Sequence, residues 1–188
     1  MSTLLGIIEG FYGPVWNWQE RKQLVRTLAP HGYGFYLYAP KADAFLRRRW
    51  QEPHPPAMVT ELAEFGRFCR QQGLRFGIGL SPFEIFNRFD DAARSALVAK
   101  LEMLDRIGID ELAILFDDMR ADTPALAETQ ADIMHWVRER TQAHYLSMCP
   151  SYYSDDPVLD RVFGERPTAY LETLGRRLDH DIQVFWTG

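Results

Sequence analysis

Short apolar segments alternate with amphipathic helical patterns along the whole chain. An almost uninterrupted apolar run of about four to eight residues is typical of a strand that is buried on both faces, as in a parallel sheet. Six segments have this pattern, at residues 5–11, 35–39, 75–80, 112–116, 145–149 and 182–186. Strands that alternate with helical patterns predict an α/β fold with a parallel sheet.

Five helices are predicted between these strands from apolar positions that recur at helical spacing. Asn17 and Glu20 have the spacing of a capping box before the first helix, and Gly108 marks the end of the third. Thr123-Pro124 and Pro167 are the predicted starts of the fourth and fifth helices. The apolar stripes are Leu24, Val25 and Leu28; Val59, Leu62, Phe65 and Cys69; Leu97, Leu101 and Leu104; Ile133, Met134 and Val137; and Leu171, Leu174 and Leu178.

Polar or glycine-rich segments follow the carboxyl end of nearly every predicted strand. These segments are residues 9–13, 40–43, 81–82, 117–118, 150–153 and 187–188. In a (β/α) barrel such loops all meet at one mouth, whereas a doubly wound sheet gathers its ligands mainly at one switch point. Periodicity alone does not separate the two folds, but the placement of these segments favours a TIM-type barrel.

The number of predicted strands is too small for a closed barrel, which has eight strands and about 250 residues. With six strands and five helices, residues 1–188 correspond to the N-terminal three quarters of one barrel domain. The open edges of such a sheet have to be covered. We therefore expect either a further C-terminal segment that completes the barrel or a partner chain, such as a second copy in a dimer.

Composition and charge exclude several classes of protein. The 188 residues are 46% hydrophobic with a formal net charge of −5, which is typical of one soluble globular domain and argues against a nucleic-acid partner. The one dense basic run, Arg47 to Arg49, is better explained as a solvated rim. No apolar stretch is long enough to span a membrane. The two cysteines, Cys69 and Cys149, argue against a disulfide framework, and the cytoplasm is the predicted location.

The strongest chemical signal is the pair Asp117 and Asp118, which directly follows the fourth predicted strand. Adjacent carboxylates where a buried strand surfaces favour acid chemistry, with one carboxylate charged and the other protonated. Two other interpretations stay open. Both residues could be surface acids that cap the next turn, or they could form, with Asp122, a DDxxxD site for Mg²⁺. Asp122 itself, next to Thr123-Pro124, is better explained as a helix cap.

Four motifs occur in order from the first predicted strand to the last residue. They are residues 6–13 (Gly-Ile-Ile-Glu-Gly-Phe-Tyr-Gly), 36–41 (Tyr-Leu-Tyr-Ala-Pro-Lys), 115–118 (Leu-Phe-Asp-Asp) and 185–188 (Phe-Trp-Thr-Gly). Together they resemble the catalytic domain of the family 84 glycoside hydrolases, the β-N-acetylglucosaminidases that include protein O-GlcNAcase. The resemblance implies a TIM-type barrel, and four ordered motifs are far more specific than any single one.

The resemblance implies hydrolysis of terminal β-linked N-acetylglucosamine in glycans or glycoproteins, with retained configuration and without a metal or other cofactor. The substrate's own 2-acetamido oxygen is the nucleophile and forms an oxazoline intermediate. By position, Asp117 orients and polarises the acetamido N–H, and Asp118 is the general acid and then the base. Because Asp118 must hold a proton, we expect burial and the charge of Asp117 to raise its pKa. Both side chains reach one sugar only if the chain leaves the extended conformation there.

The resemblance also implies substrate contacts for Gly10, Lys41 and Tyr153. Gly10 offers its backbone carbonyl to a sugar hydroxyl, Lys41 contacts the sugar, and Tyr153 assists the acetamido group during ring closure. Family members usually carry an acid directly after this lysine, whereas Ala42 stands here. By the resemblance, Trp186 lies near the end of the pocket that binds the acetyl group. It is equally well explained as a core residue.

Three functional classes therefore stay open at the level of sequence. The first is a retaining N-acetylglucosaminidase. The second is a non-catalytic, truncated barrel that binds N-acetylglucosamine, because the family's residues that grip the distal hydroxyls follow the fourth motif, and remote contacts normally hold the reacting centre in place. The third, a magnesium-dependent enzyme that uses the aspartate cluster, is the weakest, because similar cation motifs lie on helices and this one ends a strand.

Overall fold

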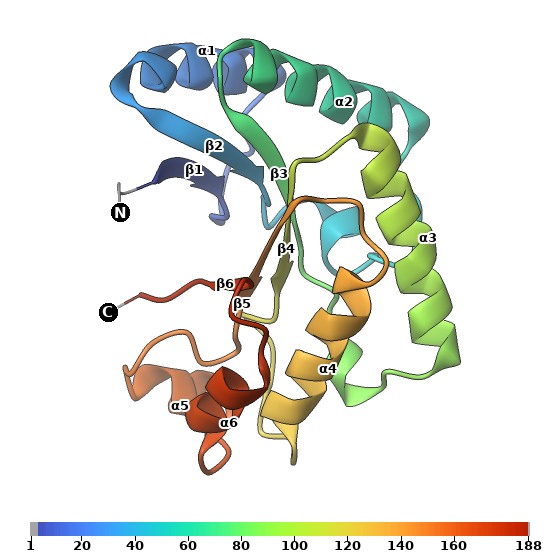
Figure 1. Ribbon diagram of the computed structural model, residues 1–188, viewed down its shortest axis with the longest axis vertical. Helices are drawn as coiled ribbons and strands as arrows, with labels where there is room; N and C mark the ends of the chain where they lie inside the picture. Colours follow the sequence, from blue (N-terminus) through green and yellow to red (C-terminus); the bar gives the residue numbers. More distant parts are fainter. Residues whose placement is uncertain (1–3, 188) are drawn as a thin grey trace.

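All six predicted strands are present, and they form one parallel sheet. The computed structural model describes residues 4–187. The strands are β1 (Leu5–Glu9), β2 (Tyr33–Tyr38), β3 (Arg75–Leu80), β4 (Glu111–Leu115), β5 (Tyr145–Cys149) and β6 (Gln183–Val184). The sheet curls into a half-barrel with the helices outside, and β1 and β6 are its two edges (Figure 1).

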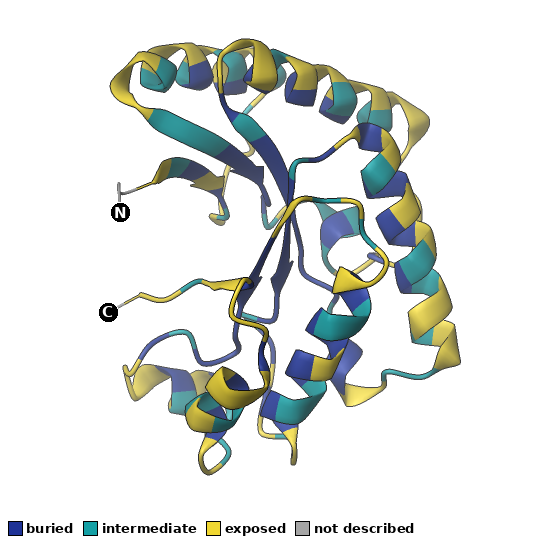
Figure 2. Cartoon of the chain, viewed as in Figure 1, coloured by how far each residue is buried: buried dark blue, intermediate teal, exposed yellow. Residues whose placement is uncertain are grey.

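The helices all pack on the outer face of the sheet and bury their inward sides (Figure 2). They are α1 (Trp18–Leu28), α2 (Pro56–Gln71), α3 (Asp91–Ile107), α4 (Leu126–Arg138), α5 (Val158–Phe163) and α6 (Tyr170–Arg177), with the 3-10 turns η1 (Ala29–His31), η2 (Ala44–Leu46) and η3 (Ile85–Asn87). Within residues 4–187, no helix is both long enough and apolar enough to cross a membrane.

The strand order decides between the two folds that periodicity left open. Each strand pairs in parallel with the next one along the chain, from β1 to β6. A doubly wound sheet requires a point where the order reverses, and the sheet formed by the described residues has none. The TIM-type barrel is therefore confirmed as the fold class, in a six-stranded half-barrel form.

The helices differ from prediction mainly at their starts. α4 and α6 each begin a few residues after the proline predicted to open them. The residue before each helix, Ala125 or Ala169, has a left-handed backbone with φ of 55° or 56°, a conformation that a right-handed helix does not contain. The short helix α5 was not predicted, because its two buried side chains, Leu159 and Phe163, are too few to define a period.

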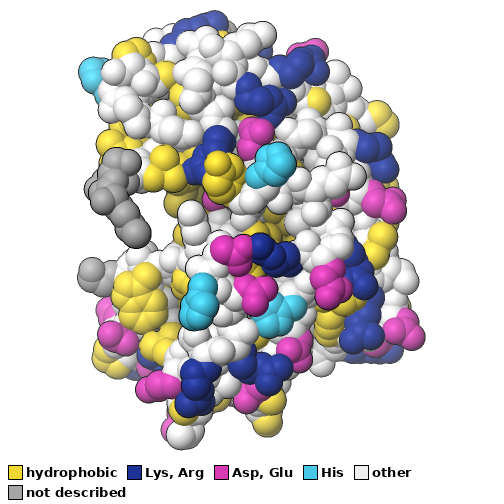
Figure 3. Space-filling view, viewed as in Figure 1, with side chains coloured by type: hydrophobic (Ala, Val, Ile, Leu, Met, Phe, Trp, Pro, Cys, Tyr) yellow, Lys and Arg dark blue, Asp and Glu magenta, His cyan; other side chains and the backbone are white. Residues whose placement is uncertain are grey.

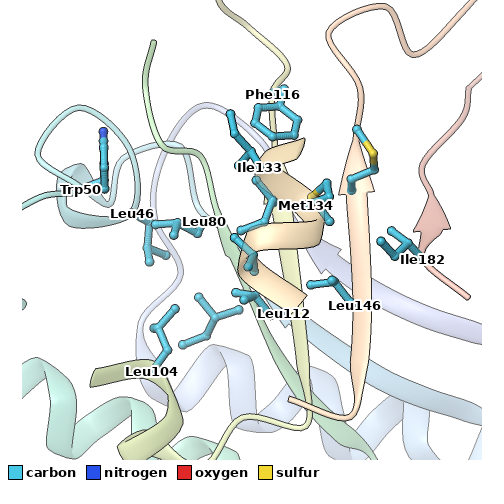
Figure 4. Packing of buried hydrophobic residues seen from close by; sticks show 14 of the residues in the cluster. Leu46, Trp50, Leu80, Leu104, Leu112, Phe116, Ile133, Met134, Leu146 and Ile182 are labelled. Atoms are coloured by element: carbon cyan, nitrogen blue, oxygen red, sulfur yellow. The ribbon is translucent and has the colours of Figure 1, made fainter. Parts of the chain in front are cut away.

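The main hydrophobic core lies between the sheet and the helices. Leu112 and Leu146 of the strands belong to the same buried cluster as Leu104 of α3 and Met134 of α4 (Figure 4). Alternate strand residues form a second, smaller cluster on the opposite, inner face of the sheet. Its buried members are Leu37, Ala39, Ala113, Leu115 and Cys149. Burial on both faces explains why the strands are continuously apolar in sequence.

A buried ion pair fixes α1 against the first two strands. The guanidinium of Arg21 donates to both carboxylate oxygens of Glu9, at 2.7 and 2.9 Å, and the Tyr36 hydroxyl donates to the same carboxylate at 2.6 Å. The guanidinium also lies 4.5 Å from the ring centroid of Trp18. Glu9 is therefore a structural acid, and it anchors the end of β1 from which Gly10 follows.

We expect Arg21→Met to destabilise the fold by about 3–5 kcal/mol, because it leaves the Glu9 carboxylate buried without its cationic partner. The matched control is Arg67→Met on the exposed side of α2, expected to change the free energy of unfolding by less than about 0.5 kcal/mol. Urea unfolding followed by circular dichroism measures both. Equal effects of the two substitutions would contradict the structural role of the Glu9 ion pair.

Candidate active site

A hollow of about 630 Å³ opens at the carboxyl ends of the strands. In a (β/α) barrel this is the end where ligands bind. The structure places all five predicted site residues on the hollow: Gly10, Lys41, Asp117, Asp118 and Tyr153. Their contributions to binding and catalysis stay predictions. The last residue of the fourth motif, Gly188, lies outside the described residues.

The ammonium group of Lys41 joins the two carboxylates. Its Nζ lies 2.6 Å from Oδ2 of Asp117 and 2.8 Å from Oδ2 of Asp118. The lysine side chain is 6% exposed, and the carboxylate side chains are 15% and 22% exposed. The pair is thus enclosed and charge-compensated, which is not the environment of surface acids that merely cap a turn.

The backbone at Asp118 explains how two adjacent side chains converge. β4 ends at Leu115, and Asp118 has a left-handed φ of 59°. On a regular strand, neighbouring side chains point to opposite faces, so this turn brings Asp118 to the side of Asp117. The expected departure from the extended conformation is confirmed.

The expected rise in the pKa of Asp118 is wrong for this structure. Burial alone would raise the pKa of Asp118, but the hydrogen bond and charge of Lys41, the hydroxyl of Tyr12 and the charge of Arg47 outweigh it and hold the pKa below its usual range. For Lys41, burial alone would lower the pKa, but the two carboxylates outweigh burial and raise it. Both ends of the Lys41–Asp118 contact are therefore charged near neutral pH.

Tyr12 contacts Asp118, although it was not among the predicted site residues. Its hydroxyl donates to Oδ2 of Asp118 at 2.9 Å, and its pKa is raised by burial and by that carboxylate. Asp118 Oδ2 thus receives two donors, whereas Oδ1 of Asp117 is buried and has no hydrogen-bond partner among the described residues. Asp117 Oδ1 is therefore a buried acceptor for which the described residues supply no donor.

Two neighbouring tyrosines in the loop after β5 have different environments. Tyr152 is fully buried and donates its hydroxyl to the carbonyl of Gly164, so it is structural. Tyr153 lines the hollow, and burial together with Asp118 raises its pKa. The buried thiol of Cys149 and the half-exposed ring of Trp186 complete this wall. Sequence analysis missed Cys149, because a cysteine at a strand end carries no distinguishing pattern.

The aspartate cluster required by the magnesium alternative does not form. The carboxylate of Asp122 binds the guanidinium of Arg120 at 2.6 and 2.8 Å. The position between Asp117 and Asp118 is taken by the Lys41 ammonium. Among residues 4–187, no three acidic, histidine or cysteine side chains are grouped as metal ligands. The described geometry therefore does not support a DDxxxD cation site.

Comparison with known proteins agrees with this geometry. The sequence model of the β-N-acetylglucosaminidases matches residues 5–188, nearly the whole chain. The chain belongs to the β-N-acetylglucosaminidase family. The resemblance of the four motifs to the family 84 glycoside hydrolases is thereby confirmed.

The similar proteins include two mammalian β-N-acetylglucosaminidases. Mouse and rat proteins named Protein O-GlcNAcase (Mus musculus and Rattus norvegicus) are each 29% identical to the chain over 194 residues. The match covers 98% of this chain and 21% of each relative, so the chain spans about a fifth of their length. An O-GlcNAc hydrolase of Thermobaculum terrenum, solved as a mutant, has a TM-score of 0.85 and 30% identity, covering 98% of this chain and 41% of that one.

In this β-N-acetylglucosaminidase family member, Lys41→Met should raise the pKa of Asp118, because the lysine holds it low. Carboxyl ¹³C NMR measures the titration directly, with Lys22→Met on α1 as the control that leaves it unchanged. A depressed native pKa contributes stability above the unfolded value of about 3.9, and this stability is lost as the pH falls through the native pKa. An Asp118 titration unaffected by Lys41→Met would show that the contact is absent in solution.

Proposed function

We propose that residues 1–188 form the major part of the catalytic domain of a retaining hydrolase that removes terminal β-linked N-acetylglucosamine. The observation that carries the proposal is the convergence of Asp117 and Asp118 on Lys41, at a hollow in a member of the β-N-acetylglucosaminidase family. The volume of about 630 Å³ lies within the range of small-ligand sites. The proposed substrates are N-acetylglucosaminyl glycans or glycoproteins.

The placement of the carboxylates supports a reaction through an oxazoline intermediate. In the two-carboxylate scheme, acid and nucleophile flank the scissile bond from opposite sides. Here both carboxylates contact the same lysine Nζ, so they are held close together. The proposed nucleophile is the 2-acetamido oxygen, which is within reach of the anomeric carbon in the sugar itself.

Each aspartate has a distinct part in this reaction. The Asp117 carboxylate accepts the acetamido N–H and stabilises the positive charge of the forming oxazolinium ring. The acetamido oxygen bonds to the anomeric carbon while the bond to the aglycone oxygen breaks, and Asp118 gives that oxygen its proton. Water then attacks the same carbon and reopens the ring, and Asp118 takes the proton from the water.

Sugar binding has to change the protonation of Asp118 before the first step. In the described state Lys41 keeps this carboxylate ionised. A sugar hydroxyl that accepts a hydrogen bond from the Lys41 ammonium draws this cation away from Asp118. Burial of the Asp118 carboxyl beneath the sugar then favours its protonated form. Gly10 and Tyr153, which line the same hollow, are the proposed contacts for a sugar hydroxyl and the acetamido group.

Apolar side chains are exposed at the open side of the half-barrel. Ile8 and Trp186 are each 47% exposed and Val184 is 44% exposed. The space-filling view is hollowed between the part that carries β1 and the part that carries β6 (Figure 3). We propose that further strands of a longer polypeptide pair with these edges and complete the barrel, as the longer chain of the T. terrenum relative suggests. A second copy of the chain is the alternative.

A non-catalytic protein that binds N-acetylglucosamine is the second candidate, favoured by the unpaired edges beside the hollow.

We also propose a cytoplasmic location. The two buried cysteines, which are both free, support this location.

We expect the protein to release 4-methylumbelliferone from its N-acetylglucosaminide, with no change on adding EDTA. Asp118→Ala should slow a methyl glycoside by about a hundredfold or more and the activated aryl glycoside far less, because only the methyl leaving group needs a proton. Asp117→Asn should slow both by about a hundredfold, because ring closure accompanies the departure of either leaving group. Steady-state rates measure these losses.

Several outcomes would contradict the proposal. Equal losses on the two substrates would remove the acid role of Asp118, and an unchanged rate in Asp117→Asn would remove acetamido assistance. Binding of N-acetylglucosamine without product release from the folded protein would replace the hydrolase with the sugar-binding alternative.

The native polypeptide should be larger than the 21.8 kDa of these 188 residues, by enough to supply two further strands and their helices. Mass spectrometry of the protein isolated from its source measures this directly. A native mass of 21.8 kDa with a dimer in sedimentation analysis would favour a second copy as the covering partner. The same mass with a monomer would contradict barrel completion.

A further inference from the structure

The loop between β2 and α2 reaches Asp118 twice. Lys41, near its start, binds the carboxylate, as described above. Arg47, in the middle of the loop, donates from Nη2 to the backbone carbonyl of Asp118 at 3.1 Å. The family motifs draw attention to the lysine, whereas the arginine lies in a basic run that the sequence presented as a solvated rim.

The Arg47 guanidinium has few other partners. Its Nε is buried and has no hydrogen-bond partner among the described residues, and its Cζ lies 5.4 Å from the ring centroid of Phe83. Neighbouring Arg48 has the same distance of 5.4 Å to that ring but is exposed and makes no hydrogen bond within the described part of the chain. Arg47 is thus directed at Asp118, and Arg48 is its natural control.

The backbone on both sides of Arg47 is anchored. The carboxylate of Asp43 caps η2 by accepting the Phe45 N–H at 3.0 Å, and the Ser81 N–H after β3 donates to the carbonyl of Leu46 at 2.8 Å. Buried Lys100 of α3 donates to the carbonyls of Phe45 and Glu52, at 3.0 and 2.7 Å. This loop is a fixed support rather than a mobile flap.

Such a support stabilises Asp118, because its left-handed backbone is less favourable for aspartate than for glycine. We propose that Arg47 is a positioning residue: by holding the Asp118 carbonyl, it keeps the backbone turn that aims this carboxylate at the aglycone oxygen. The inference rests on the proposed function. It adds a cation that acts through the backbone of the acid rather than on the sugar.

The charged and titratable groups that face Asp118 come from several loops. They are Lys41 and Arg47 after β2, Tyr12 after β1, Asp117 beside it, Cys149 at the end of β5, and Tyr153 after β5. Arg47 contributes positive charge as well as geometry. Its loss should therefore move the Asp118 titration to higher pH, a change that a purely structural support of the loop would not by itself produce.

The test compares Arg47→Met, Arg47→Lys and Arg48→Met in the same protein. Arg47→Met should slow the methyl glycoside by about tenfold to a hundredfold, as expected for a displaced acid, and the aryl glycoside by less than about threefold. In ¹³C NMR the Asp118 carboxyl should titrate at higher pH in this variant. Arg47→Lys, which keeps the charge, should restore a low pKa and part of the rate, and Arg48→Met should change neither.

The proposal is overturned if Arg47→Met slows both substrates equally, if it leaves the Asp118 titration unchanged, or if Arg48→Met has the same effects. If Arg47→Met does not fold, Arg47→Lys gives the decision: full activity with an unchanged leaving-group dependence would overturn the requirement for the guanidinium. The titration needs no turnover. An inactive wild-type protein would therefore refute the proposed function, while the pKa of Asp118 would still decide the Arg47 contact.

Discussion

One ammonium group between two carboxylates is the interaction on which the site depends. Lys41 follows β2 and the aspartates follow β4, so the contact ties together loops from both sides of β3. Two adjacent carboxylates would otherwise repel each other in a partly buried place. The lysine ammonium lies between them and compensates their negative charge.

The fold could be predicted well because its signals are local. Burial on both faces makes each strand continuously apolar, and the capping box at Asn17 and Glu20 forms as its spacing indicated. The starts of α4 and α6 could not be predicted from their prolines, because left-handed residues intervene before each helix. α5 escaped prediction because six residues carry too little periodicity.

The positions of the site residues could be predicted, whereas their electrostatic state could not. Asp117 is the charge directly adjacent to Asp118 in the sequence, so a raised pKa was the natural expectation. The deciding partners, Lys41 and Arg47, precede the acid pair by more than seventy residues, and only the curl of the sheet brings them to it. Tyr12 was not predicted as a partner for the same reason, since it precedes Asp118 by 106 residues in the sequence.

The unpaired edges of β1 and β6 have a consequence for biosynthesis. Any element that closes the sheet between them joins the most distant parts of the half-barrel, and contacts of such long sequence separation form slowly. β1 leaves the ribosome before β6, with Ile8 exposed beside an unpaired edge. Until closure, this edge is a template for association with other nascent chains. Early shielding of this edge therefore limits the time during which a nascent chain can associate through it.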